Sequence, residues 1–502
     1  MKVSNLDIVI TTDRTMMSNH HGREFLGFVA TGPSIGLPEF LWTWISSPKP
    51  KIKANGEPNE APYGLRKVEA VLLDKGYNAS IIDPSYLNRY ADTSKLLLVG
   101  HHDFFAYGPP SNEWWLITGR EPVNRKSFRR LMESPAVKKM RRRGVKIIAG
   151  GPAAWQWLYE VELWKKWGVT SIFDGEAERI LPNIIEKALN NEELPFYIYA
   201  GSHDSPSIEE IPTIKKASVN GLIEIMRGCP RGCKFCSVTL RPLRYIPLEK
   251  IEEEVLVNVR NGVTRGLIHS EDILLYGADG VKPRPDPVLK LHDTVLKHVK
   301  SLAWSHASLA AIKYAEEEHK LITKVMEKIR EKQDYIGVEV GVETGGYELA
   351  KKIMPAKSAP YKPEKWHEVV EDAFRIMHEN NIIPAATLII GLPEETEKDV
   401  METIELIEKL RPYRSLIVPM LFVPMGNLKH GVMFKREMLK DSHIELMFKI
   451  LDHSIYWSEE IMNHYYLKSR AYDPLKFLLR FFIGYVKRKT DKIRKNLIIA
   501  ST

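Results

Sequence analysis

The sequence contains little cysteine. There are three cysteines in 502 residues, and all of them lie in one short stretch, at Cys229, Cys233 and Cys236. An odd number packed this tightly excludes a framework of disulfide bonds, which spreads paired cysteines along a chain. A chain that avoids cysteine elsewhere and gathers it here is expected to use it for metal binding or redox chemistry.

Long apolar runs are also missing. No stretch reaches the roughly 18 apolar residues that a membrane-spanning helix needs. The apolar segment 477–486 is shorter and is interrupted by Arg480. The first residues, MKVSNLDIVITTDR, lack the apolar core and cleavage site of a signal peptide and predict a first β-strand. We therefore expect a cytoplasmic protein.

Charge of one sign is only mildly in excess. The net charge is +8, from 72 basic and 64 acidic residues, and hydrophobic residues make up 44% of the chain, as in ordinary globular proteins. The excess of positive charge is consistent with an anionic substrate, partner or membrane surface, and equally with a role in solubility alone. Short basic runs such as 139–146 are typical of solvated helix faces, so nucleic-acid binding is not expected.

Residues 1–200 alternate between strand and helix patterns. Apolar runs predict strands at 6–10, 78–82, 96–99, 145–149 and 170–173, and amphipathic patterns predict helices at 63–75, 137–143 and 178–189. This alternation predicts an α/β fold, a doubly wound Rossmann-like domain with a parallel sheet covered on both faces. The Pro- and Gly-bearing segment 43–63 is expected to form a long surface loop.

Two turns in this first domain follow predicted strands directly. One carries Gly150 and Gly151, and the other carries Gly175 and Glu176. Open α/β sheets bind ligands at the carboxyl ends of their strands, so both turns are candidate binding segments. Plain strand–helix turns would have the same sequence, and this alternative stays open.

After a linker at 201–220, the alternation restarts over 221–430. Six strands are predicted, at 222–226, 266–269, 302–305, 335–342, 385–390 and 415–423. Helical patterns follow the first five, at 248–261, 287–300, 316–332, 347–353 with 364–379, and 397–410. This order predicts a partial (β/α)6, TIM-like barrel with its active site at the carboxyl ends of the strands. Residues 431–502 are predicted to form a helical C-terminal region with aromatic residues and a basic end.

The cysteines have the spacing C-x3-C-x2-C. Three thiolates on one loop can ligate three irons of a [4Fe–4S] cluster and leave the fourth iron open, while Gly228 and Gly232 allow tight backbone turns. An open iron can chelate a methionine moiety, and electron transfer into its sulfonium yields a 5′-deoxyadenosyl radical. A zinc site is the alternative, but it would need a fourth ligand and usually uses pairs of C-x2-C.

This loop resembles the C-x3-C-x-aromatic-C motif of the radical SAM superfamily, with Phe235 at the aromatic position. The resemblance implies that Phe235 lies near the adenine of S-adenosylmethionine. It extends to segment 337–345, which implies that Glu343 and Thr344 approach the ribose and methionine, although Glu343 also suits a salt bridge. The segment His269-Ser270-Glu271-Asp272 stands where that family has Gly-Gly-Glu-Pro.

Segment 387–396 is similar to the adenine-contacting fifth strand of the same family. The resemblance implies cofactor contacts for Ile389, Gly391 and Glu394. A salt bridge at the helix entry is the alternative role for Glu394.

Over residues 1–430 the architecture resembles the cobalamin-binding subclass of radical SAM enzymes. This resemblance implies that Gly150, Gly151, Gly175 and Glu176 contact cobalamin. The D-x-H-x-x-G signature that supplies a histidine ligand to cobalt is absent. The dyads at 20–21 and 101–102 are candidate histidines for facing cobalamin or substrate, or else surface and capping histidines. Aromatic walls for a substrate are expected from four tryptophans, Trp42, Trp44, Trp114 and Trp115.

The resemblance implies an enzyme that cleaves S-adenosylmethionine with an electron from an electron donor for the cluster and modifies an unactivated carbon. Cobalamin-dependent C-methylation, of a protein side chain or an isoprenoid lipid, is the leading expectation. Carbon–carbon bond formation, cyclisation or rearrangement without methyl transfer is the alternative. A methylthiolating enzyme would need cysteines for a second cluster, and a bare electron carrier would not need an adenine site. The C-terminal tail suits either peripheral membrane contact or a packed terminal helix.

Overall fold

The computed structural model describes residues 5–22 and 25–501. The chain divides into two compact units. Unit 1 comprises Met1–Cys229, Leu240–Ser270 and Asp293–Leu302, and unit 2 comprises Pro230–Thr239, Glu271–His292 and Ala303–Thr502. The predicted domain boundaries at residues 200, 220 and 430 stay predictions.

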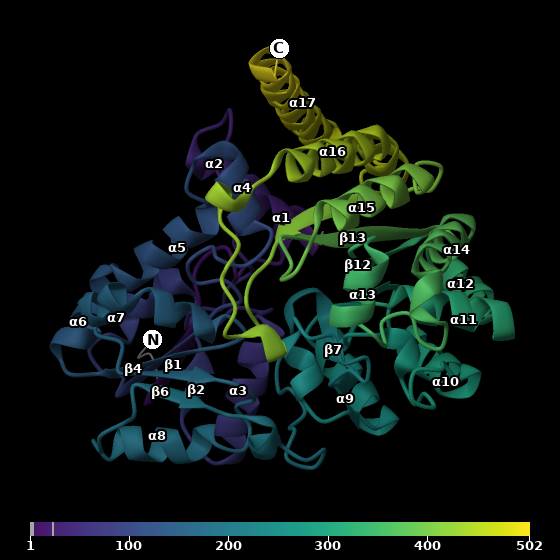
Figure 1. Ribbon diagram of the computed structural model, residues 1–502. Coiled ribbons are helices and arrows are strands. Elements are labelled where there is room, and N and C mark those ends of the chain that lie inside the picture. Colours follow the sequence, from purple (N-terminus) through teal and green to yellow (C-terminus); the bar gives the residue numbers. More distant parts are fainter. Residues whose placement is uncertain (1–4, 23–24, 502) are drawn as a thin grey trace. The chain divides into compact units, whose positions relative to one another are not determined.

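A six-stranded parallel sheet forms the centre of unit 1 (Figure 1), with strand order β2-β1-β3-β4-β5-β6. Its strands are β1 (Ile8–Thr11), β2 (Ala79–Ile81), β3 (Leu96–Gly100), β4 (Lys146–Gly150), β5 (Ser171–Asp174) and β6 (Tyr197–Tyr199). Successive side chains point to opposite faces, so Ile8 and Ile10 join one apolar core and Val9 joins the other. Both faces of the sheet are therefore buried.

Helices cover the two faces separately. Helices α3 (Tyr63–Asp74) and α8 (Leu181–Leu189) contribute to one core, and α5 (Val123–Met132), α6 (Pro135–Arg142) and α7 (Val161–Trp167) contribute to the other. The doubly wound prediction is thus confirmed. Helices α1 (Phe25–Ala30), α2 (Glu39–Ser46) and α4 (Ser111–Thr118) also lie in this part of the chain.

Strand β6 was not predicted from the sequence. Its three residues include two tyrosines, and it pairs with β5 along one side only, at the edge of the sheet. The apolar signal of an edge strand this short is weak, because its side chains are only partly covered.

All six strands predicted for the second half of the chain form, as two three-stranded sheets ordered β11-β10-β7 and β12-β13-β14. They are β7 (Leu222–Glu224), β10 (Arg265–His269), β11 (Ser301–Trp304), β12 (Ile336–Glu343), β13 (Ile382–Ile390) and β14 (Leu416–Leu421). A short antiparallel pair, β8 (Met226–Arg227) with β9 (Arg244–Tyr245), was not predicted. The chain just after β11 meets β12 through one parallel bridge, from His306 to Glu339.

The helices that follow these strands are near their predicted positions, with one exception. They are α9 (Leu248–Arg260), α10 (Pro285–Leu296), α11 (Leu309–His319), α12 (Leu321–Arg330), α13 (Tyr347–Ile353), α14 (Trp366–Glu379) and α15 (Glu397–Lys409). The single helix expected over 316–332 is wrong, because Lys320 takes a left-handed conformation (φ 50°) that ends α11 and begins α12.

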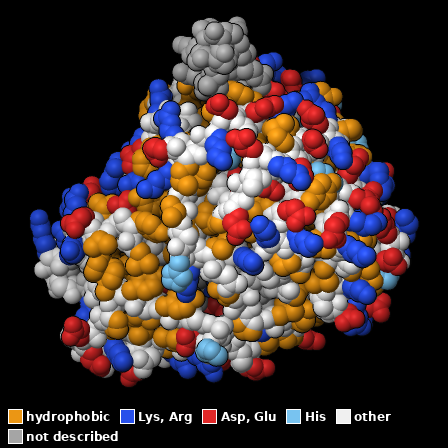
Figure 2. All heavy atoms as spheres, in the orientation of Figure 1, with side chains coloured by type: hydrophobic (Ala, Val, Ile, Leu, Met, Phe, Trp, Pro, Cys, Tyr) orange, Lys and Arg blue, Asp and Glu red, His pale blue; other side chains and the backbone are white. Residues whose placement is uncertain are grey.

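The C-terminal region is helical, as predicted. It consists mainly of α16 (Asp441–Ile461) and α17 (Asp473–Ser501), which Figure 1 shows running away from α16. Among the described residues no helix combines the length and the apolar character that crossing a membrane requires. Figure 2 shows basic and acidic side chains interspersed over the visible face.

Candidate functional site

The backbone of the cysteine loop is held by hydrogen bonds. In unit 2, Cys233 is buried and Cys236 is half-buried, while Cys229, also half-buried, is the last residue of the first segment of unit 1. The N–H of Lys234 donates to the carbonyl of Ile353 (2.8 Å), and the hydroxyl of Thr239 donates to the carbonyl of Cys236 (2.8 Å). The backbone between Cys233 and Cys236 is therefore shaped by the protein itself.

Both glycines of the loop have left-handed backbones. At Gly228 (φ 82°) a Cβ atom would lie 2.7 Å from the carbonyl oxygen of Pro242, so only glycine fits. At Gly232 (φ 63°) a Cβ atom would meet nothing within 4 Å. Gly232 is needed for its backbone conformation, and the space beside it is open.

Arg231 fastens the loop to two distant segments of unit 2. This residue is 2% exposed, and its Nη1 donates to the carbonyls of Ala356 (3.2 Å), Lys357 (3.1 Å) and Ala359 (2.8 Å). Its Nε lies 3.5 Å from the carboxylate of Asp272. Burial raises the pKa of Asp272, and the charge of Arg231 opposes that rise. Sequence reasoning did not identify Arg231, because its acceptors are backbone atoms far along the chain.

Glu343 lies at the carboxyl end of β12. Its side chain accepts hydrogen bonds from Lys357 Nζ (3.0 Å) and Thr387 Oγ1 (3.2 Å), and the residue is 7% exposed. Its φ of 66° is uncommon for a residue other than glycine and is typical of functional positions. At Gly341 a Cβ atom would lie 2.0 Å from Glu343 Oε1, so this glycine makes room for the carboxylate.

Cys233 shares this region with the Glu343–Lys357 pair. Burial raises the pKa of the Cys233 thiol; the charges of Glu343 and Cys236 act in the same direction, and Lys357 opposes them. The thiol, the carboxylate and the ammonium group are therefore electrostatic neighbours within unit 2. Lys357, like Arg231, carries no sequence signal of its role.

One face of the β12–β13 sheet is partly open. Alternate residues on it are half-buried, namely Gly337, Glu339, Gly341, Ala385, Thr387 and Ile389. The register pairs Gly341 with Thr387 and Ile389 with Met420 of β14. Ile389, expected to contact adenine, thus lies on the same face of β13 as Thr387, which donates to Glu343. Phe235, the other expected adenine contact, is half-buried.

Thr344 is buried at 1% exposure and serves the backbone. Its hydroxyl accepts from the N–H of Gly346 (3.1 Å), and its carbonyl accepts from the indole N–H of Trp366 (2.9 Å). The role that the structure shows for Thr344 is to anchor the turn that follows Glu343.

The turn after β13 contains Gly391, Glu394 and Glu395. Gly391 (φ 80°) packs against Phe434, and a Cβ atom there would lie 2.0 Å from the ring. Glu394 also has a left-handed backbone (φ 67°), but its exposed side chain pairs with Lys352 (3.2 Å) on the surface. Its neighbour Glu395 is the enclosed carboxylate, and it accepts from the N–H of Gly391 (2.9 Å) and lies 2.9 Å from His443 Nε2. Glu394 thus makes the surface salt bridge that the sequence allowed as its alternative role.

The carboxyl edge of the unit 1 sheet carries the predicted glycines. Gly150 ends β4, and at Gly151 (φ 112°) a Cβ atom would lie 2.8 Å from the carbonyl of His101. At Gly175 (φ 134°) a Cβ atom would lie 2.4 Å from the carbonyl of Ala200. These glycines allow neighbouring chain segments to approach closely at the end of the sheet.

Glu176 is engaged by two arginines within unit 1. It lies 2.9 Å from Arg227 Nη1, and both of its oxygens accept from Arg244 at 2.9 Å. Burial raises the pKa of Glu176, but the positive charges of Arg227 and Arg244 outweigh burial and hold it below its usual range. Glu176 therefore connects the turn after β5 to the strand that leads into Cys229.

The histidine dyads differ in their surroundings. The Nδ1 of His101 accepts from the N–H of Asp103 (2.7 Å), so its Nε2 is the atom that donates to Asp13 (3.1 Å). His102 is exposed to solvent. In the other dyad, burial lowers the pKa of His20, whose Nδ1 lies 2.6 Å from the carbonyl of Ser46, and His21 is exposed.

The segment that replaces Gly-Gly-Glu-Pro follows β10, which His269 ends. Ser270 and Asp272 are buried, and Glu271 is half-buried. The four tryptophans expected to form aromatic walls differ in exposure. Trp42 is buried, Trp44 is 67% exposed, and Trp114 and Trp115 are half-buried.

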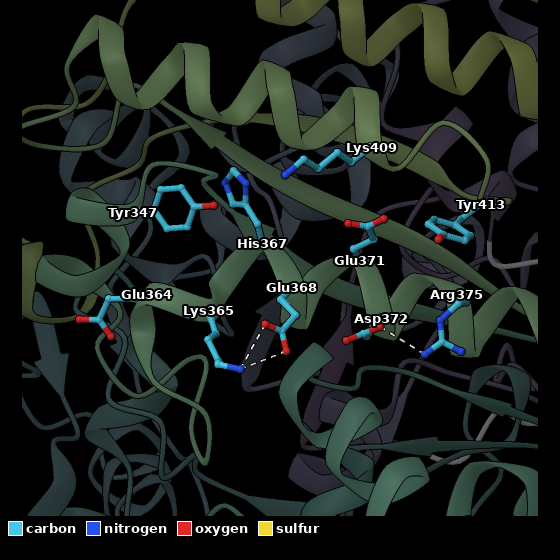
Figure 3. A pocket seen from close by; sticks show the side chains of 10 residues that line it. All are labelled: Tyr347, Glu364, Lys365, His367, Glu368, Glu371, Asp372, Arg375, Lys409 and Tyr413. Atoms are coloured by element: carbon cyan, nitrogen blue, oxygen red, sulfur yellow. Dashed lines mark hydrogen bonds and ion pairs between the residues drawn. The ribbon is translucent and has the colours of Figure 1, made fainter.

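A polar cavity of about 400 Å³ lies on the outer helices of unit 2 (Figure 3). Its walls carry opposite charges that pair with each other, as Lys365 does with Glu368 and Arg375 does with Asp372. The residues that line it are Tyr347, Glu364, Lys365, His367, Glu368, Glu371, Asp372, Arg375, Lys409 and Tyr413. None of the predicted site residues is among them, so the cavity is distinct from the cysteine loop.

Among the described residues, no three or more His, Cys, Asp or Glu side chains are gathered around a point where they could hold one metal ion. An iron–sulfur cluster does not require its ligands to converge on one point, since each thiolate binds a different iron. The donor set of the loop, three cysteines on a glycine-bearing segment, suits such a cluster.

Curated relatives match part of the chain. An uncharacterized protein of Methanopyrus kandleri is 28% identical over 39% of this chain and 38% of its own length. A tRNA-2-methylthio-N(6)-dimethylallyladenosine synthase of Clostridium botulinum is 26% identical over 40% of this chain and 42% of its own length. The synthase of the same name from Staphylococcus haemolyticus is 23% identical over 59% and 54%. The chain thus spans about two fifths of the length of the first two relatives.

Two solved structures share the fold. Both are of TsrM, a radical S-adenosylmethionine methyltransferase from Kitasatospora setae, one with cobalamin and a [4Fe–4S] cluster bound and one with tryptophan substrate and a SAM analogue bound. The TM-scores are 0.52 and 0.53 at 14% identity, over 82% of this chain and 75% and 73% of the TsrM chains. Residues 223–407 match the family described as the Radical SAM superfamily. The matched residues include the cysteine loop and the Glu343 segment, so this part of the chain is similar to the radical SAM superfamily.

Proposed function

We propose that the protein binds a [4Fe–4S] cluster through Cys229, Cys233 and Cys236 and cleaves S-adenosylmethionine reductively. The observation that carries this proposal is the neighbourhood of Cys233, where the Glu343–Lys357 pair lies on the same unit as the buried thiol. The superfamily match of residues 223–407 supports it. A cluster bound by three cysteines leaves one iron free for the cofactor.

The residues of this chain would have distinct tasks in that reaction. The bound cluster supplies the electron that breaks a carbon–sulfur bond of the cofactor. Glu343 offers a carboxylate to the polar groups of the cofactor, and Lys357 and Thr387 hold it in place. Arg231 keeps the loop against segment 356–359, which carries Lys357. Positioning of this kind is the main contribution that a protein makes to chemistry performed by a cofactor.

We further propose that the doubly wound sheet of unit 1 binds cobalamin and that the reaction is a C-methylation. The shared fold with TsrM supports this proposal, since one TsrM structure holds cobalamin. The edge that carries Gly151 and Gly175 lies at the carboxyl ends of β4 and β5, where parallel sheets bind ligands. Radical carbon chemistry without methyl transfer is the alternative.

Methylthiolation is a second candidate, because two of the relatives bear that activity in their names. The cysteine content of the sequence argues against methylthiolation. Such an enzyme needs cysteines for a second cluster, and the three in this sequence all lie in one loop.

An isotope experiment separates these candidates. The reconstituted protein would be supplied with S-adenosylmethionine carrying a deuterated methyl group, under anaerobic reducing conditions, together with cobalamin. C-methylation predicts that cobalamin becomes methylated with the label. Absence of corrinoid from the protein after incubation with excess cobalamin and gel filtration would contradict the cobalamin proposal. Iron analysis should give about four irons per chain, and Cys233→Ala should lose most of them.

A further inference from the structure

Helix α17 exposes two aromatic side chains on one of its faces. Phe477 is 70% exposed and Phe481 is 45% exposed. These residues are four positions apart, so they lie one turn from each other on the same side of the helix. Exposed aromatic pairs of this kind mark interaction surfaces more often than isolated apolar residues do.

The opposite face of α17 accounts for its packing. Leu475, Leu479 and Val486 are half-buried and Thr490 is buried, and their spacing of four, seven and four residues places them on one stripe. Ile483, Gly484 and Tyr485 are half-buried as well, so the described contacts of the helix with its own protein do not include the exposed ring of Phe477. The phenylalanine stripe remains unexplained by packing.

The helix is also strongly basic. The segment 473–501 contains eight basic residues and two acidic ones. Three of the basic residues lie on or beside the exposed stripe. Lys487 and Arg488 are exposed, and Arg480 forms an exposed ion pair with Glu459 (3.2 Å). The side chains of Leu478, Phe482, Lys489 and residues 492–501 lie outside the described part of the structure.

We propose that α17 docks the protein on the surface of a membrane that contains anionic lipids. Phe477 and Phe481 would enter the boundary between headgroups and acyl chains, and the basic side chains would face the headgroups. The helix is 29 residues long, about 43 Å, and is too rich in charge to cross the bilayer. It would therefore lie along the surface. The proposal goes beyond the proposed catalytic function and does not depend on the cluster or cobalamin.

Vesicle flotation with the full chain tests this proposal. Vesicles of neutral phosphatidylcholine would be compared with vesicles that also contain phosphatidylglycerol, at low and high salt. We expect binding to the anionic vesicles, and we expect 1 M salt to weaken it because screening shortens the range of the attraction to about 3 Å. Replacing Lys487 and Arg488 by Gln should weaken binding roughly 25-fold, at about fivefold per basic residue.

The aromatic contribution is tested by Phe477→Ser combined with Phe481→Ser. This double variant should bind at least about tenfold more weakly. Two exposed residues of unit 2 supply matched controls. Val432 is 71% exposed, and the side chain of Lys398 is 76% exposed. Val432→Ser and Lys398→Gln should bind as the unchanged protein does. Far-UV circular dichroism and light scattering verify that each variant is folded and report its oligomeric state.

Three outcomes would overturn the proposal. The first is no binding to either vesicle by the folded full chain. The second is equal binding to neutral and anionic vesicles. The third is a dimer that the double serine variant dissociates while the unchanged protein ignores vesicles, since that result would assign the stripe to contact with a second copy. Flotation does not require the cluster, so its failure leaves the proposed catalytic function untouched.

Discussion

Replacing Arg227 should destabilise unit 1 severely. Its guanidinium group lies 2.9 Å from Glu176, 2.7 Å from Glu178 and 2.8 Å from Glu224, and its side chain is only 9% exposed. Nearby carboxylates raise the pKa of Arg227 well above its usual range, although burial opposes that rise. Arg227→Met fills a similar volume but removes the charge.

The stability lost in Arg227→Met depends on which carboxylates lose their only guanidinium partner. Glu176 keeps Arg244, at 2.9 Å, whereas Glu178 and Glu224 lose their guanidinium partner. Breaking a buried ion pair by removing one member typically costs about 3–5 kcal/mol. For a unit of this size the melting temperature should fall by roughly 6–20 °C. Glu178→Gln removes one charge and leaves Arg227 two carboxylates, so it should cost only about 1.5 kcal/mol.

Thermal unfolding of the two variants and the unchanged protein, followed by circular dichroism, measures these differences. Arg227→Met should also lower the iron content after reconstitution, because Arg227 lies two residues before Cys229. A loss of stability below about 1 kcal/mol for Arg227→Met, or a larger loss for Glu178→Gln, would refute this reasoning.

Three further predictions concern other positions. Gly391→Ala should cost about 2–5 kcal/mol, because a Cβ atom there is strained by the φ of 80° and overlaps Phe434. In denaturant unfolding, Gly391→Ala combined with Phe434→Ala should cost less than the sum of the two single changes. Burial, aided by the charge of Arg411, lowers the pKa of His453 to about 4. Between about pH 6.5 and pH 4 the unfolded chain binds a proton at this histidine and the folded protein does not, so the free energy of unfolding falls as the pH drops through this range. His453→Gln should lessen that fall by about 3 kcal/mol, as measured by denaturant unfolding at several pH values. The pKa of Glu176 is held low, so its contribution is present above about pH 4.3 and lost below it; Glu176→Gln should flatten acid unfolding curves below pH 4.5, and an unchanged slope would contradict the assignment.

The sequence predicted the features that depend on local pattern. Cysteine spacing, the glycines at 228 and 232, and the alternation of strands and helices are properties of neighbouring residues, and the corresponding elements form. The break at Lys320 could not be predicted, because a left-handed lysine has no reliable sequence signal.

The partners of the site could not be predicted, because they depend on chain segments brought together by folding. Arg231 reaches carbonyls 125 to 128 residues away, and the same segment carries Lys357, which donates to Glu343. At the turn after β13, adjacent glutamates point in different directions, so Glu394 is at the surface and Glu395 is enclosed. Which of two adjacent glutamates is enclosed depends on the backbone conformation of the loop, and the pattern of side chains in the sequence does not predict it.

The central claim is tested most directly by the formation of 5′-deoxyadenosine. The cluster-loaded protein would be reduced anaerobically with S-adenosylmethionine, and the nucleoside would be measured by mass spectrometry. We expect 5′-deoxyadenosine from the unchanged protein and none from Cys233→Ala, with Glu343→Gln strongly reduced. If the reduced, cluster-loaded protein makes no 5′-deoxyadenosine, the assignment of Cys229, Cys233 and Cys236 to reductive cleavage of S-adenosylmethionine is wrong.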